Sequence, residues 1–84
     1  MKFGEAIEHL KQNGMVRREG WNGKGMHLFY VKESELSLSD GKSGAARTIK
    51  ASPYIMMYTA QGDCVPWLAS QTDVLAEDWS IIGA

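Results

Sequence analysis

The stretch YIMMYTAQGDCVPW, residues 54–67, decides the fold of this chain. Residues 54–59 are rich in aromatic and apolar side chains, which is typical of a buried strand. Gln61, Gly62 and Asp63 then supply the residue types of a tight hairpin turn. Residues 64–67 follow as a returning strand, so the stretch predicts an antiparallel hairpin on which a sheet is built.

Three further strands are predicted on either side of this hairpin. Residues 26–31 are mostly apolar without clear alternation, which favours a well-buried strand. Residues 15–18 and 78–82 read as a short strand and a closing strand. Residues 32–53 are polar and rich in small side chains, and we interpret their centre as a turn or a mobile loop that weak strands flank.

Helical signals appear at both ends of the chain. Phe3, Ile7 and Leu10 stand at i, i+4 and i+7, which places them on one face of a helix that ends at Asn13 and Gly14. Near the C-terminus, Ser70 and Asp73 resemble the cap of a short helical turn that runs to Ala76. The expected fold is α+β: one domain over residues 1–84, in which an N-terminal helix packs on an antiparallel sheet of about five strands.

Size and composition limit the classes of protein. The chain has 84 residues and a net charge of −1, and it contains one cysteine, Cys64, which excludes an internal disulfide. A chain of this length buries only about 60% of its unfolded surface, so we expect subunit contacts to support the fold. No apolar stretch is long enough to cross a bilayer and no signal-peptide core can be drawn, so we expect a cytoplasmic protein without a membrane partner.

Charge is distributed unevenly along the chain. The first fifty residues carry nine basic and six acidic side chains, whereas the last 34 carry four acidic side chains and no Lys or Arg. We expect the positive part of one subunit to face the negative part of its neighbour in an oligomer. The near-neutral total argues against binding to a nucleic acid polymer, which needs many Lys and Arg contacts to phosphates.

Catalytic signatures are weak. The sequence has no GxSxG elbow and no phosphate-binding loop that ends in Lys-Ser or Lys-Thr. His9, His27 and Cys64 do not have the spacing of metal ligands. Asp73 and Asp78 form a possible carboxylate pair, although capping of the adjacent turn explains them more simply. We therefore expect neither an enzyme nor a cofactor.

Two segments carry the residue types of a nucleotide site. Residues 17–25 combine cations, Trp21, Asn22 and three glycines, which suit phosphate, base face and base edge. Residues 66–73 place Trp67 before four hydroxyl, amide or carboxylate side chains. In each segment the alternative is that the tryptophan fills the core beside a turn or a helix cap.

The residues of these segments resemble a known family. The stretches FGEAI (3–7), GWNGKGM (20–26), PYI (53–55) and VPWLASQTDVLAEDW (65–79) are similar to the second Thoeris anti-defence family of small phage and prophage proteins. The resemblance covers most of residues 3–31 and 53–82, whereas residues 32–52 carry no recognisable pattern.

The resemblance implies a function that composition does not. Proteins of this family are homotetramers that sequester glycocyclic ADP-ribose, the signal made by bacterial TIR-domain defence proteins, without cleaving it. Their pockets lie between subunits, and some relatives also bind cyclic dinucleotides. Alternatives from other classes are a small nucleotide-cleaving enzyme and an inhibitor that binds a defence enzyme directly.

Site residues follow from the resemblance position by position. It implies that Trp21 stacks on a base, that Asn22 bonds a base edge, and that Arg18 and the backbone of residues 20–25 contact the diphosphate. The remaining implied contacts form a wall and polar partners for ribose or base, with two apolar lining residues. The full set of ligand-binding residues is Arg18, Gly20, Trp21, Asn22, Gly25, Phe29, Met57, Trp67, Ala69, Ser70, Gln71 and Asp73. His27 and Val74 depart from the side-chain shapes expected at their positions.

Overall fold

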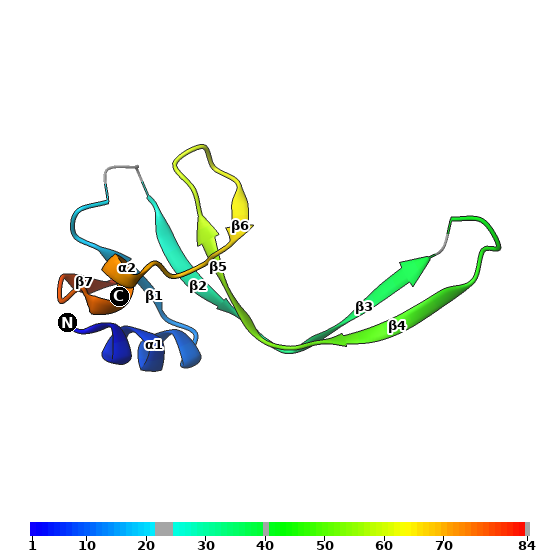
Figure 1. Ribbon diagram of the computed structural model, residues 1–84, viewed down its shortest axis with the longest axis horizontal. Coiled ribbons are helices and arrows are strands. Elements are labelled where there is room, and N and C mark those ends of the chain that lie inside the picture. The colour runs from blue at the N-terminus through cyan, green and yellow to red at the C-terminus, as the bar shows by residue number, and fades with distance from the viewer. Residues whose placement is uncertain (22–24, 40, 84) are drawn as a thin grey trace.

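A computed structural model describes residues 1–21, 25–39 and 41–83 of the chain. It contains two helices and seven strands in these ranges (Figure 1). In chain order they are α1 (Phe3–Lys11), β1 (Met15–Arg18), β2 (His27–Val31), β3 (Ser34–Ser39), β4 (Ala46–Ala51), β5 (Tyr54–Tyr58), β6 (Cys64–Pro66), α2 (Gln71–Leu75) and β7 (Trp79–Ile82).

Five of the strands form an antiparallel sheet in the order β6-β5-β2-β1-β7. The central hairpin is the predicted one, with Met57 of β5 opposite Val65 of β6. Leu28 of β2 lies opposite both Val16 of β1 and Met57 of β5, so these apolar side chains share one face of the sheet. β7 closes the sheet by pairing with β1, as expected for residues 78–82.

Helix α1 covers this face and forms the core with it. Ala6 and Leu10 of α1 are fully buried, as are Val16 and Leu28 of the sheet, and Trp79 is 2% exposed. The helix begins where the Lys2 backbone N–H donates to the Glu5 carboxylate, 3.1 Å away. The opposite face of the sheet, which we call the open face, carries half-buried side chains such as Phe29 and Met56.

β3 and β4 form a second, two-stranded sheet that we call the arm. The arm continues the β2–β5 hairpin in the same register, since Val31 lies opposite Tyr54 and Ser34 lies opposite Ala51. The two ladders are interrupted in between, where Pro53 has no N–H to donate. In Figure 1 the arm projects away from the helices and the five-stranded sheet.

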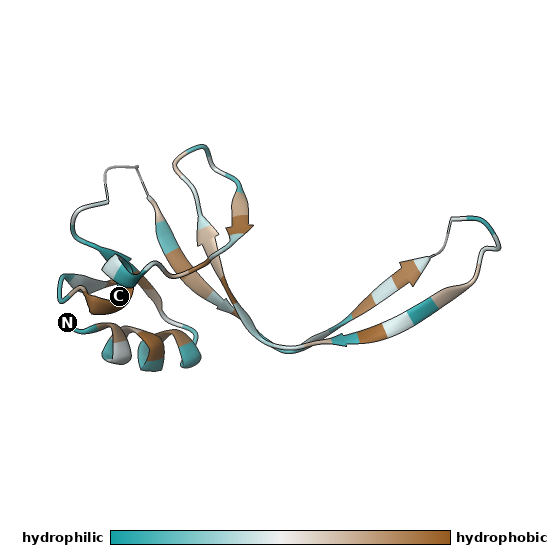
Figure 2. Ribbon diagram, viewed as in Figure 1, coloured by the Kyte–Doolittle hydropathy of each residue, from teal (hydrophilic) through white to brown (hydrophobic). Residues whose placement is uncertain are grey.

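The arm makes the molecule elongated. Its principal extents are 50 × 28 × 26 Å and its radius of gyration is 15.8 Å, against about 12 Å for a compact chain of this length. Every residue of β3 is exposed. Figure 2 shows hydrophobic and polar residues alternating along both arm strands.

The predicted fold class, α+β, is wrong, because the chain is mostly β. Its helices have nine and five residues, and the seven strands outweigh them. The error lies in residues 32–53, where the expected turn has strands on both sides, but these are two full six-residue strands that the expected five-stranded sheet leaves out. Their Ser-rich and Gly-containing sequence is typical of a turn, but pairing that continues from β2 and β5 outweighs local propensity.

Candidate functional site

Four aromatic rings gather at the N-terminal end of α1 and the start of β7, and we call them the aromatic cluster. Trp79 is its centre, with ring centroids 5.6 Å from Trp21, 6.0 Å from Trp67 and 5.4 Å from Phe3. The rings of Trp21 and Trp67 meet Trp79 edge-on, at 78° and 84°. The structure therefore brings the two predicted nucleotide segments together through one buried indole.

Backbone and indole hydrogen bonds hold each tryptophan. The N–H of Trp21 donates to the Arg18 carbonyl at 3.2 Å, and the N–H of Trp67 donates to the Ile55 carbonyl at 2.9 Å. The indole N–H of Trp79 donates to the Asp73 carbonyl at 3.0 Å. Trp21 and Trp67 are half-buried, so the sequence alternative, in which they pack on the core, is correct for part of each ring.

Arg18 of β1 forms ion pairs with two carboxylates. Its Nη1 lies 3.0 Å from Asp73 Oδ1 and its Nε lies 2.9 Å from Asp78 Oδ1. The three side chains are 21%, 17% and 38% exposed, respectively. A guanidinium can serve two carboxylates in this way because its N–H groups form a rigid planar fork.

These contacts shift the ionisation of the three groups. The hydrogen bond from Arg18 lowers the pKa of Asp78. Partial burial opposes ionisation of Asp73, but hydrogen bonds from Arg18 and Ser70 outweigh it and lower the pKa of that carboxyl. Hydrogen bonds to Asp78 and Asp73 raise the pKa of Arg18. All three groups are therefore charged at neutral pH.

α2 begins at the capping box that the sequence predicts. The Asp73 N–H donates to Ser70 Oγ at 3.1 Å, and the Ser70 N–H donates to Asp73 Oδ2 at 3.3 Å. Ser70 Oγ also donates to Asp73 Oδ2 at 2.9 Å. Asp73 thus uses one carboxylate oxygen for the helix cap and the other for Arg18.

The other predicted contacts of the two segments are placed around this cluster. Gly20 is exposed and lies beside the Asp78 carboxylate. Gly25 is exposed with a φ of 74°, a conformation that suits glycine. Ala69 is half-buried and Gln71 is exposed at the first position of α2. Asn22 lies outside the described residues.

Phe29 and Met57 lie on opposite faces of the sheet. Phe29 is opposite Met56 on the open face, whereas Met57 is opposite Leu28 and packs against the core. Side chains that point to opposite faces of one sheet do not line the same pocket. Within one chain, therefore, only Met57 belongs to the side of the sheet that carries the aromatic cluster.

Sequence reasoning missed the role of Asp78 as a partner of Arg18. It gave Asp73 the roles of helix cap and ligand contact and explained Asp78 by the adjacent turn, whereas both bind the guanidinium across 55 and 60 positions of sequence. The expectation that Trp79 is a core residue is confirmed by its 2% exposure. No local pattern links Arg18 to residues so far along the chain.

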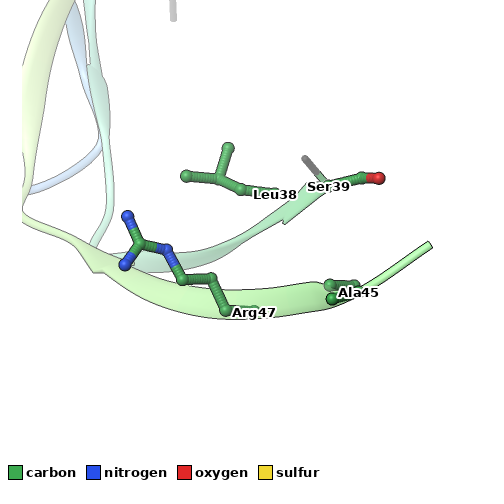
Figure 3. Close-up of a pocket in the computed structure, with 5 residues that line it drawn as sticks. Leu38, Ser39, Ala45 and Arg47 are labelled. Atoms are coloured by element: carbon green, nitrogen blue, oxygen red, sulfur yellow. The ribbon is translucent and has the colours of Figure 1, made fainter. Parts of the chain in front are cut away.

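Two concave regions of the described structure lie away from the aromatic cluster. One, of about 420 Å³, is in the arm and is lined by Leu38, Ser39, Ala45, Ala46 and Arg47. Figure 3 shows the side chains of Leu38 and Arg47 projecting on the same side of the arm, as their opposite register positions require. The other, of about 300 Å³, is lined by residues near the C-terminal end of α1 and by β7.

Within residues 1–21, 25–39 and 41–83, no group of three or more His, Cys, Asp or Glu side chains could hold a metal ion. Neither helix has the length and apolarity that a membrane-spanning helix needs.

Comparison with known proteins decides the family. A sequence model of the Thoeris anti-defense 2-like domain matches residues 1–82. The chain belongs to the Thoeris anti-defense 2-like family. It is also 47% identical over 85 residues to Thoeris anti-defense 2 of Bacillus phage SP01, an alignment that covers 98% of this chain and 94% of the phage protein. Membership of this family supports an anti-defence role against Thoeris.

Proposed function

We propose that this protein is an anti-defence sponge. It binds glycocyclic ADP-ribose, a cyclic ADP-ribose signal, in the host cytoplasm and holds it without cleaving it, so that the Thoeris effector is not activated. The observation that carries the proposal is the convergence of Trp21 and Trp67 on Trp79, because two half-exposed indoles from two motifs supply stacking surfaces for a nucleotide.

The binding free energy needed to sequester the ligand determines how many contacts this site must provide. Nanomolar affinity corresponds to about 12 kcal/mol, and stacking on an aromatic ring contributes roughly 1–3 kcal/mol per base. Two indoles therefore account for half of the affinity at most, and polar partners such as Ser70, Gln71 and the Gly25 backbone must supply the rest. The edge-on contacts to Trp79 hold both rings in place, which lowers the ordering cost of binding.

The proposed pocket is completed by a second subunit. Neither concave region described above is lined by Trp21 or Trp67. Phe29 faces away from the aromatic cluster of its own chain, so it can line a pocket only beside the cluster of a neighbour. We therefore propose that the pocket is shared between subunits, and the family resemblance favours a homotetramer.

The arm supports self-association. An isolated two-stranded ribbon is at best marginally stable in water, yet β3 and β4 pair over six residues each. One face of the arm carries Leu36, Leu38 and Ile49, which are 52%, 44% and 37% exposed. The arm of a second copy, which presents the same apolar face, is the occupant that fits by symmetry.

A depletion experiment tests the function. Purified protein is mixed with glycocyclic ADP-ribose, the protein is removed by filtration, and the nucleotide is measured by mass spectrometry before and after heat release. The sponge predicts depletion followed by recovery of intact ligand. Recovery of ADP-ribose would indicate a cleaving enzyme, and no depletion together with co-purification of a defence enzyme would indicate a direct inhibitor.

A pair of adjacent variants controls this experiment. Trp67→Ala removes a proposed stacking face and is expected to deplete less ligand when the protein concentration is close to the dissociation constant of the unmodified protein. Leu68→Ala changes a neighbouring side chain that is 90% exposed, and it is expected to deplete the ligand as the unmodified protein does. Equal loss in both variants would show that the segment is needed for folding rather than for stacking.

A further inference from the structure

We propose that Arg18 is a positioning residue that locks the two tryptophan-bearing motifs together, rather than the residue that binds the phosphates of the ligand. The inference rests on the proposed function, whose ligand supplies the affinity to be measured. It changes the role that the family resemblance implies for Arg18.

Arg18 holds one motif through its backbone and the other through its side chain. Its carbonyl accepts the Trp21 N–H at 3.2 Å. Its guanidinium binds Asp73 in α2 and Asp78, the residue before β7, at 3.0 and 2.9 Å. Arg18 also lies directly opposite Trp79 in the β1–β7 register. One residue therefore fixes where Trp21 stands relative to the segment that carries Trp79.

Asp78 repeats this connection from the other side. Its carbonyl accepts the Glu19 N–H at 3.0 Å, and its carboxylate lies beside Gly20. Asp73 joins the same network through its carbonyl, which accepts the indole N–H of Trp79. The link between the motifs is thus a closed set of hydrogen bonds rather than a single contact.

The local charge opposes a phosphate at this place. One guanidinium faces two carboxylates, so the group carries a net negative charge. Both oxygens of Asp73 are engaged, one with Arg18 and the other with Ser70. A diphosphate brought to Arg18 would compete with both carboxylates and be repelled by them.

The test compares three variants by calorimetric titration with glycocyclic ADP-ribose at several salt concentrations. Arg18→Gln removes the charge, Arg18→Lys keeps it without the fork, and Asp78→Asn removes one partner. Positioning predicts that all three weaken binding, on the order of tenfold, with an unchanged salt dependence. Arg17→Gln and Glu77→Gln are the matched controls, because their side chains are exposed neighbours, and they are expected to bind normally.

A phosphate-binding Arg18 predicts opposite results. Lys would then restore most of the affinity as a point charge, Asp78→Asn would strengthen binding by releasing the guanidinium, and Arg18→Gln would flatten the salt dependence. Any of these outcomes overturns the proposal, as does unchanged binding in all three variants.

A measurement without ligand separates this proposal from the proposed function. Near-ultraviolet circular dichroism reports the packing of the indoles, and Arg18→Gln and Asp78→Asn are expected to change it while Arg17→Gln does not. If the unmodified protein binds no glycocyclic ADP-ribose, the proposed function fails. The spectra of the variants still test whether Arg18 positions the two motifs. Spectra identical to that of the unmodified protein would overturn the positioning role even if the ligand binds.

Discussion

Assembly through the arm is tested by introducing a charge on its apolar face. In the β3–β4 register Leu36 lies opposite Ile49 and Leu38 lies opposite Arg47, while Ser37 and Thr48 face the other side. Leu36→Asp places a carboxylate where we expect the arm of a second copy, and Ser37→Asp places the same group one residue away on the opposite face. The two variants have the same net charge and differ only in the face that they alter.

The expected effect follows from the exposure of Leu36. It is 52% exposed, so covering it stabilises the assembly by about 1 kcal/mol per copy, half of the value for a leucine. A carboxylate buried at the same place adds a desolvation cost of at least ~2 kcal/mol, even with Arg47 on the same face of the arm. Two copies in a symmetric interface lose about 6 kcal/mol, which raises the dissociation constant on the order of 10⁴-fold.

Sedimentation velocity across a wide range of protein concentration measures this change. We expect the unmodified protein and Ser37→Asp to sediment as the same oligomer and Leu36→Asp to sediment as a smaller species. The difference is expected to persist at high salt, because apolar burial is not screened. Leu36→Asp that assembles like the unmodified protein would refute the assignment, and equal disruption by both variants would refute the choice of face.

Three further predictions concern the site. Trp21→Ala and Trp67→Ala are each expected to weaken binding of glycocyclic ADP-ribose by about 1–3 kcal/mol, as measured by calorimetry, whereas a normal affinity in both would place the ligand elsewhere. Ser70→Ala removes the cap of α2 and is expected to lower the free energy of unfolding in urea by about 1 kcal/mol. The pKa of Asp73 is lowered in the folded state, so its contribution is fully present above the unfolded value of about 3.9 and is lost as the pH falls through the folded value. The stability difference between the unmodified protein and Arg18→Gln is therefore expected to shrink below about pH 4, and a constant difference in urea titrations would contradict the ion pairs.

The strands of the five-stranded sheet could be predicted because their signals are local. Apolar runs that follow Gly25, Pro53 and Asp63 mark β2, β5 and β6, and the periodicity of Phe3, Ile7 and Leu10 marks α1. Most apolar side chains of α1, β2 and β5 are buried or half-buried within the chain, so composition and burial agree there, whereas β6 is exposed. The same reasoning correctly made Trp79 a core residue.

The arm could not be predicted in this way, and the fold class was therefore wrong. Leu36, Leu38 and Ile49 alternate with Ser, Thr, Glu and Lys, and they are exposed in the single chain. Their strands form because they continue the register in which β2 pairs with β5. That register depends on both paired segments together, so neither segment indicates it alone. Strands whose apolar side chains are exposed in the single chain give weak signals when the sequence is judged alone.

The candidate site was predicted in its residue types but not in its connections. The two tryptophan segments were found because indoles, glycines and polar side chains gather there in the sequence. The Arg18 contacts were not, since Asp73 and Asp78 are 55 and 60 residues away. Pairings at such distances depend on the order of strands in the sheet, which places β1 beside β7.

These contacts change the interpretation of the uneven charge along the chain. The sequence suggested that basic residues of one subunit face acidic residues of its neighbour. In the structure, Asp73 and Asp78 are already paired with Arg18 of the same chain, and the Asp63 carboxylate accepts a hydrogen bond from Thr59. Three of the four acids in the last 34 residues are therefore engaged internally. The charges of Asp73 and Asp78 therefore join the two motifs within a subunit, and in the assembly that we propose the apolar face of the arm supplies the main attraction between subunits.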